Sequence, residues 1–437
     1  MLCGESWRET RALSLQTKKT HAFFFFFPPR ASRDAESRSL SPRHHAHALP
    51  PALSLPLPPS RQAFNPGALG ILLVTDVPDL PTLRAALLPC AHALAARLSP
   101  AARARLEDPA SSYQMGWSHG REALVGGRPD TAKGSFYANP LVDDPGRAGG
   151  EEEEGDGGGA AAVAAAYPGL ARPCVWPVGG HGDPAEDALA AALAPAFRGA
   201  SAAMAAVGRA VAAAADALLA SRGTSPSLSL VAALGTGRGA KGRLLYYFPP
   251  GDQENGGAPA AAAAAPTTAA ANDDDGWCGW HVDHSLLTVL CPAAYLSAGT
   301  GEEVACPDGR AGLWVRARGG GATPRESGPA TRVTIPAGAL AVQFGEAAQV
   351  LAGGALVAAP HCVRPPGVAT TPPTSRASFA LFLQPWVTVP LTPPAGRGDE
   401  ATVGVPRWRP GDTFGKFSER TVAAFCFWGE GKERVEA

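Results

Sequence analysis

The chain has 437 residues, enough for one large domain or two medium ones. Its formal net charge of −1 at pH 7 gives it no basic field suited to a nucleic acid, so we expect no nucleic-acid partner. The 51 glycines and 43 prolines make up more than a fifth of the residues, so much of the length is not typical of a packed core.

The cysteines and the apolar runs indicate a compartment. Eight cysteines lie at positions 3, 90, 174, 278, 291, 306, 362 and 426. None of them forms a CxxC pair, which favours reduced thiols in an intracellular, cytoplasmic protein. The run Phe23–Phe27 ends in two prolines, and no uninterrupted apolar run has the length of a membrane span. We therefore expect no membrane partner.

Residues 1–62 have the composition of a disordered tail. They contain nine Lys or Arg against four acids, together with Ser, Pro and a cluster of His. This composition is typical of a plastid or mitochondrial transit peptide, and a plastid location is the alternative to the cytoplasm. The simpler interpretation is an unstructured tail or a wrongly included upstream region.

Residues 63–230 are predicted to form a mainly helical N-terminal region. Order begins with a short strand in Ala68–Val74, and Asp79 is placed to cap a helix that runs to about Ser99, before Pro100.

The rest of this region contains loops, an insertion and further helices. Tyr113–Glu122 and Lys133–Pro140 show no period and are interpreted as loops. Residues 145–166 form a low-complexity insertion. The Ala-rich segment from Pro184 to Arg222 predicts one or two long helices, interrupted at Pro195.

Residues 231–437 are predicted to form the β-rich part of the chain. Val231–Phe248 reads as a loop followed by a strand at Leu244–Phe248, and a low-complexity loop at 251–275 comes next. Gly, Pro and Asp then punctuate short apolar segments, which favours an all-β barrel or jelly roll. The predicted strands are Gly312–Arg318, Arg332–Ile335, Leu340–Phe344, Val350, Leu356–Ala359 and Ser378–Gln384.

The stretch from Gly276 to Leu290 carries the chemistry. If it is an extended strand, His281 and Asp283 project from one face, and Val282 and His284 from the other. One imidazole and one carboxylate are two of the three ligands of a 2-His-1-carboxylate iron site. The candidate for the third ligand is His361, which follows the apolar run Ala355–Ala359 and Pro360.

A second pair of polar side chains follows His361. Arg376 and Ser378 lie two residues apart at the start of an apolar strand and therefore share a face. A guanidinium fork grips a carboxylate through two hydrogen bonds, and a hydroxyl adds a third. A dicarboxylate held by the metal at one end could therefore be anchored here at the other.

The order of these motifs resembles a known family. His-x-Asp, a distant His and Arg-x-Ser at the head of an apolar strand resemble the Fe(II)- and 2-oxoglutarate-dependent dioxygenases, in the isopenicillin N synthase-like branch. The resemblance covers residues 68–425. It extends to an uncharacterised group of plant and algal proteins through Tyr113–Glu122, Lys133–Pro140, Trp280–Leu290, Pro360–Arg364 and Trp408–Arg420.

The resemblance implies a fold and a site. The fold would be mainly β with α, a double-stranded β-helix (jelly roll) preceded by helices. The metal ligands would be His281, Asp283 and His361, and 2-oxoglutarate would be held by Arg376 and Ser378. The family's Asn-Tyr-Tyr-Pro strand also holds the co-substrate. The resemblance places Tyr246 and Phe248 at its Asn and second Tyr, and of these two only Tyr246 can donate a hydrogen bond.

The implied activity is oxidation, most simply hydroxylation, of a small organic substrate. Fe(II), 2-oxoglutarate and O₂ would take part, with release of succinate and CO₂. The alternative is a non-catalytic jelly roll that binds a metal or ligand. A third hypothesis, hydrolysis at zinc or manganese held by His281, Asp283 and His284, requires a bulge that turns all three to one face. The sequence predicts neither the identity of the substrate nor the oligomeric state.

Overall fold

The structure, a computed structural model, describes residues 68–122, 129–148, 159–250, 277–317, 328–367 and 369–424. The predicted tail at 1–62 and the loop at 251–275 lie outside these residues, as do residues 149–158 of the predicted insertion at 145–166.

A nine-stranded sheet forms the larger of two sheets, and every pairing in it is antiparallel. Strand β13, the longest, lies at its centre and pairs with β4 on one side and with β6 and β7 on the other. In spatial order the strands are β1 (Ile71–Val74), β11 (Leu340–Phe344), β6 (Leu287–Leu290), β13 (Thr374–Leu383), β4 (Lys241–Tyr247), β3 (Lys133–Ala138) and β2 (Gly116–His119), with β7 (Ala294–Ser297) and β8 (Glu303–Val304) beside them.

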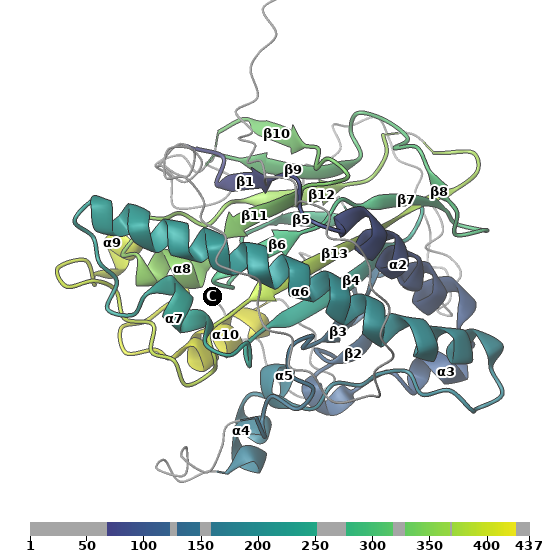
Figure 1. The fold of residues 1–437 in the computed structure, drawn as a ribbon, viewed down its shortest axis with the longest axis horizontal. Coiled ribbons are helices and arrows are strands. Elements are labelled where there is room, and N and C mark those ends of the chain that lie inside the picture. Colours follow the sequence, from purple (N-terminus) through teal and green to yellow (C-terminus); the bar gives the residue numbers. More distant parts are fainter. Residues whose placement is uncertain are drawn as a thin grey trace, which may run out of the picture.

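A smaller antiparallel sheet contains four strands and lies at the top of the view in Figure 1. Its order is β10 (Ala330–Val333), β9 (Gly312–Arg316), β12 (His361–Arg364) and β5 (Cys278–His281). An apolar cluster joins the two sheets. In it Leu313 and Val315 of β9 pack with Ile71, Leu73 and Ala341 of the large sheet.

Helices cover the large sheet. The two that pack on it most extensively are α2 (Leu80–His92) and α6 (Pro184–Ser221), which also pack against each other and cross the sheet in Figure 1. A short π-helical turn, Ala93–Arg97, continues α2. The others are α3 (Pro100–Ala104), α4 (Ala160–Ala166), α5 (Pro168–Ala171), α7 (Leu230–Leu234), α8 (Glu346–Leu351), α9 (Glu400–Val403), α10 (Phe414–Ala423) and the 3₁₀ turn Pro109–Ser111.

Helix α6 is one helix of 38 residues, so the predicted interruption at Pro195 is wrong. Pro195 lies on the exposed face, where water can satisfy the carbonyl that loses its helical hydrogen bond. On the buried face Gly208 has no side chain, and a Cβ there would lie 2.2 Å from Cδ1 of Leu383. The small residue therefore lets the helix approach β13 closely.

Helix α6 also bears on the expectation about membrane spans. By length and composition it could cross a membrane, but 56% of its most apolar window is buried inside the protein. It packs against β6 and β13, as the core helix of a soluble protein does. The finding is weak support for a membrane segment, and the absence of a membrane partner stays a prediction.

Several predicted strands are confirmed, but both predicted loops of the N-terminal region are wrong. Residues 116–119 and 133–138 form β2 and β3, which pair with each other. Their glycines hide the strand pattern. At Gly134 the absent side chain leaves room for the ring of Trp117, which would lie 2.3 Å from a Cβ there.

Other corrections concern local backbone geometry. Val350 belongs to α8, and Leu356–Ala359 is not a strand. Asp79 precedes α2 as predicted, but its φ of 58° is left-handed and its side chain makes no capping hydrogen bond. The strand predicted at 244–248 begins at Lys241. It follows helix α7 in the chain, and this helix was not predicted.

The core under α6 gives a stability prediction. Phe197 is fully buried, and its ring lies edge-on to Phe136, Trp176 and Phe379, with centroids 6.0, 5.4 and 4.8 Å away. Phe197→Ala is expected to lower the free energy of unfolding by about 3–5 kcal/mol, because it opens a cavity in this cluster. Urea denaturation measures the loss. Val178→Ala, at a side chain that is 67% exposed, is the control and should change it by less than about 0.5 kcal/mol.

Candidate metal centre

A cavity of about 340 Å³ lies between the two sheets. The large sheet contributes residues of β4, β6, β7 and β13 to its wall, and the small sheet contributes residues of β5, β9, β10 and β12. The side chains of His281, Asp283, His361, Arg376 and Ser378 all line it. The structure therefore brings both predicted groups of polar residues to one space.

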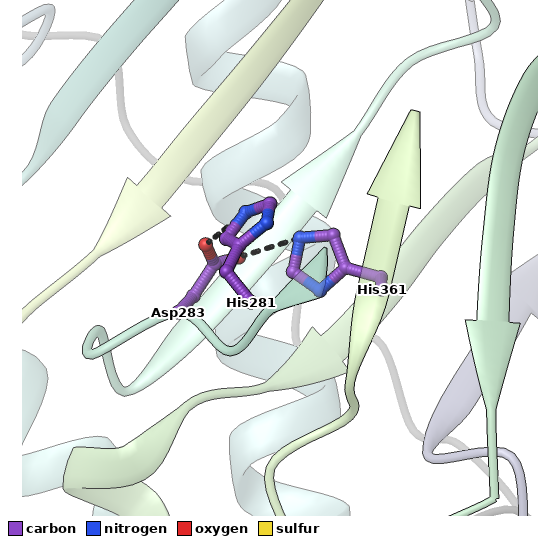
Figure 2. A group of neighbouring side chains, drawn as sticks. All are labelled: His281, Asp283 and His361. Atoms are coloured by element: carbon purple, nitrogen blue, oxygen red, sulfur yellow. Dashed lines mark ion pairs between the residues drawn. The ribbon is translucent and has the colours of Figure 1, made fainter. Parts of the chain in front are cut away.

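The candidate ligands come from two strands that pair. His281 is the last residue of β5 and His361 the first residue of β12, and the two lie opposite each other in the ladder. Asp283 follows β5 in a loop. One ligand atom from each residue lies within 4.8 Å of the others, and Figure 2 shows the three side chains converging.

The prediction that His281 and Asp283 share one face of an extended strand is wrong, although the two side chains do meet in the cavity. β5 ends at His281, so Asp283 reaches the cavity from a turn and not from the same strand face. The same turn directs His284 elsewhere, with its Nε2 3.1 Å from Oγ of Ser418 and its ring stacked on Phe414. His284 therefore does not join His281 and Asp283 in the zinc or manganese site that the hydrolytic hypothesis requires.

Both imidazoles are held in one orientation by the backbone. Nδ1 of His281 lies 2.8 Å from the carbonyl oxygen of Gly279, and Nδ1 of His361 lies 2.9 Å from that of Ala359. Because a carbonyl can only accept, each Nδ1 carries the proton. In the neutral imidazole each Nε2 therefore has the lone pair, and each Nε2 lies 3.7 Å from an oxygen of Asp283. Two lone pairs and one carboxylate are thus directed at a common point.

The carboxylate of Asp283 is anchored through one oxygen. Oδ2 accepts hydrogen bonds from Oγ1 of Thr288 at 2.6 Å and from Nε2 of Gln343 at 3.0 Å. Nε2 of Gln343 also lies 3.3 Å from Nε2 of His361, the ring nitrogen that can accept its hydrogen bond. Oδ1 is the oxygen nearest His281 and has neither of these partners. Such hydrogen bonds fix a ligating carboxylate and leave its second oxygen for the metal.

The three groups of the cluster differ in their titration. Burial raises the pKa of Asp283, but the nearby imidazoles and the hydrogen bonds from Thr288 and Gln343 outweigh it and hold the pKa below its usual range. Burial, with the charge on His281, lowers the pKa of His361 to about 4. For His281, burial lowers the pKa, but Cys278 and Asp283 raise it to about 9. At neutral pH the carboxylate is therefore ionised, His361 is neutral and metal-free His281 is protonated, so a bound metal would have to displace a proton from Nε2 of His281.

Arg376 and Ser378 lie beside each other on β13. Nη1 of Arg376 donates to Oγ of Ser378 at 3.3 Å, and its guanidinium lies 5.1 Å from the ring centroid of Tyr247. Its Nε is buried without a hydrogen-bond partner, and no acid of the described ranges pairs with it. A buried guanidinium without an anion is costly, so the arrangement suits an anionic ligand.

Tyr246 faces the other way. It is 2% exposed, it belongs to the core beneath α2 and α6, and its hydroxyl lies 3.4 Å from Nδ1 of His92. Alternation along β4 puts Leu245 and Tyr247 on the cavity wall instead. The alignment of β4 with the family's Asn-Tyr-Tyr-Pro strand, which chose Tyr246, is therefore one residue out of register. Tyr247 is the phenol that faces Arg376.

Sequence reasoning missed Gln343, Thr288 and Tyr247. Gln343 is the only polar residue of the buried strand Leu340–Phe344, and that interruption of an apolar run was an available signal. Thr288 interrupts the apolar strand β6 in the same way. Cys362 is buried and does not line the cavity, as alternation predicts, whereas Cys278 does line it, with Sγ 3.7 Å from Nδ1 of His281.

Comparisons with known proteins give structural neighbours only. No family model matches the chain, and no curated protein matches it in sequence. It is similar to a full-length Neurospora crassa protein solved in complex with alpha-KG, at 17% identity and a TM-score of 0.49, over 82% of this chain and 88% of that one.

Two further solved structures are similar. One is the dioxygenase for auxin oxidation (DAO) of rice, at 17% identity and a TM-score of 0.44, over 82% of this chain and 87% of that one. The other is JOX2 in complex with 2OG, Fe and JA, at 16% identity and a TM-score of 0.46, over 80% and 76%. Because these identities and scores are low, the proposals below rest on the side chains of the cavity.

The anchoring of Asp283 predicts an effect on metal affinity. Thr288→Val and Gln343→Leu should each weaken Fe(II) binding by about 10–100-fold, because the carboxylate loses a hydrogen bond that orients it. Anaerobic titration with Fe(II) measures the dissociation constant. Thr331→Val, on β10 and outside the cavity wall, is the control and should bind like the wild type. Unchanged affinity in both cavity variants would contradict this role.

The burial of His284 predicts a pH effect on stability. Burial lowers its pKa to about 4, from an ordinary value of 6.5. A histidine buried as the neutral form stabilises the fold fully above pH 6.5, and this contribution is lost as the pH falls towards 4. Between pH 6.5 and pH 4 the metal-free wild type should therefore lose more of its free energy of unfolding than metal-free His284→Asn does. The expected difference is on the order of 1–3 kcal/mol. Urea denaturation of the variant and the wild type at pH 7 and at pH 4 measures the difference.

Proposed function

We propose that this protein is an Fe(II)- and 2-oxoglutarate-dependent oxygenase that oxidises, most simply hydroxylates, a small organic molecule. The observation that carries the proposal is the convergence of His281, Asp283 and His361 in a cavity that also contains the unpaired Nε of Arg376. Two imidazoles and one carboxylate suit Fe(II) and leave coordination positions open. A planar guanidinium beside a hydroxyl suits a carboxylate.

The residues of the cavity would have separate roles in binding the metal and the co-substrate. His281 and His361 would bind the metal through Nε2, and Asp283 through Oδ1. Arg376 and Ser378 would hold the far carboxylate of 2-oxoglutarate, with Tyr247 against the guanidinium. Fe(II), 2-oxoglutarate and O₂ held there would supply the oxidising chemistry, with succinate and CO₂ as the co-products. The cavity wall would orient the substrate and exclude water.

The proposal includes the fold family. Two antiparallel sheets that enclose a cavity support a double-stranded β-helix, with helices packed outside the larger sheet. We place the chain in the 2-oxoglutarate oxygenase superfamily on this basis. The isopenicillin N synthase-like plant and algal branch, the division at residue 230, the cytoplasmic or plastid location and the transit peptide stay predictions from the sequence.

A non-catalytic binding protein of the same fold is the second candidate. One observation favours it: β4 presents Leu245 to the cavity where the family pattern has an amide. Leu245 cannot donate a hydrogen bond to the co-substrate. Metal and 2-oxoglutarate binding without turnover would then be the whole activity.

Anaerobic loading tests the proposal. Wild-type protein with Fe(II) and 2-oxoglutarate should show a weak visible charge-transfer band. Arg376→Gln should weaken 2-oxoglutarate binding by about 10–100-fold, because charge-assisted hydrogen bonds to the carboxylate are lost. Arg147→Gln, at a side chain that is 82% exposed, is the matched control.

Two results would decide between the candidates. Release of succinate when air is admitted identifies an oxygenase, and a band without succinate identifies a binding protein. A wild-type protein that takes up Fe(II) but never develops the band with 2-oxoglutarate would contradict the proposed co-substrate.

A further inference from the structure

The charges on the cavity wall are not balanced by the proposed co-substrate alone. The Arg, Asp and Glu residues that line the cavity are Arg243, Asp283, Glu303, Arg332 and Arg376. Asp283 belongs to the metal centre, and Arg376 is assigned to 2-oxoglutarate. The remaining three determine what else the cavity can hold.

Two of these three are already paired with residues outside the cavity wall. Arg243 forms an ion pair with Glu122, which also accepts from Lys133 at 2.9 Å. Glu303 accepts from Nη1 of Arg84 at 3.0 Å and pairs with Nη2 of the same side chain. Neither residue therefore presents an uncompensated charge to a ligand.

Arg332 is different. Its Nε donates to the carbonyl oxygen of Ala311 at 3.0 Å, and its Nη2 donates to Sγ of Cys306 at 3.2 Å. Neither acceptor is a carboxylate, and no acid in the ranges that the structure describes pairs with this guanidinium. The two contacts fix the partly buried side chain on β10 and leave its positive charge to the cavity.

The surroundings of Arg332 contain a second donor and open space. A Cβ placed on Gly312 would lie 3.1 Å from the hydroxyl of Tyr295 and 3.9 Å from Nε of Arg332. Because glycine has no side chain, the space between these two groups is not filled at this position. Burial, together with a hydrogen bond to Cys306, raises the pKa of Tyr295 to about 12, so the phenol keeps its proton, and an anion here would compete with Cys306 for it. An anion placed here would meet a guanidinium and a phenol.

The wall around this position is apolar. Leu313 of β9 lines the cavity, together with Val333 at the end of β10 and Ile335 just beyond it. A ligand that reaches Arg332 would therefore bury an apolar body between this wall and the metal centre. Polar neutral ligands would leave the guanidinium without a counter-ion and the wall poorly covered.

We propose that the substrate of this protein is a carboxylic acid with an apolar body, whose carboxylate binds Arg332 and Tyr295. This inference rests on the proposed function, because it assigns Arg376 to the co-substrate and the second guanidinium to the molecule that is oxidised. A guanidinium fork prefers a carboxylate to an uncharged amide of the same shape. The cavity therefore distinguishes the two by charge alone.

Anaerobic calorimetry on the full chain, loaded with Fe(II) and 2-oxoglutarate, tests the inference. The probes are 4-phenylbutyrate and octanoate, each compared with its primary amide. Wild-type protein should bind the acids at least 10-fold more tightly than the amides. Arg332→Gln should remove this preference and leave 2-oxoglutarate binding within about twofold. Arg332→Lys, which retains the charge, should restore part of it, and the exposed Arg310→Gln should behave like the wild type.

The possible failures are separable. Loading is measured before any acid is added, so a wild-type protein that does not take up Fe(II) and 2-oxoglutarate overturns the proposed function and this inference together. A loaded protein that binds acids and amides equally, or binds neither, overturns the carboxylate assignment alone. Loss of 2-oxoglutarate binding in Arg332→Gln would also overturn it, because Arg332 would then belong to the co-substrate.

Discussion

The pairing of β12 with β5 is the contact on which the site depends. It sets His361 directly opposite His281, although 80 positions separate them in the chain. Because facing residues of an antiparallel pair lie about 5 Å apart, the ladder itself fixes the distance between the two imidazoles. The backbone carbonyls of Gly279 and Ala359 then hold both rings with Nε2 inward. A shift of one residue in this register would turn His361 out of the cavity.

Around this pair the protein arranges charge in a low-dielectric space. Asp283 is the one carboxylate held at the centre, and hydrogen bonds from Gln343 and Thr288 make it rigid. Two guanidiniums, Arg376 and Arg332, face the same cavity without acidic partners in the described part of the chain. Arg376 is buried, so an anion would offset the cost of its charge, whereas the partly buried Arg332 keeps some access to water and would attract an anion without requiring one.

The residue types of the site could be predicted from the sequence, whereas its geometry could not. An HxD pair in an apolar segment and Arg-x-Ser at the head of a strand are local patterns. The turn that carries Asp283 into the cavity is set by tertiary contacts, among them the hydrogen bond from the backbone N–H of Glu346 to its carbonyl oxygen. The strands around Trp117 were missed for a related reason, since glycines that make room for a ring leave no periodic signal. Tyr246 and Tyr247 are both aromatic, and only the register of β4 decides which one faces the cavity.

The most direct test of the central claim is the position of a bound metal. Crystals grown anaerobically with Fe(II) should show one anomalous iron peak per chain, at about 2.0–2.3 Å from Nε2 of His281, Nε2 of His361 and an oxygen of Asp283. A peak bound elsewhere, or an ordered site in which His361 points away from the iron, would contradict the account.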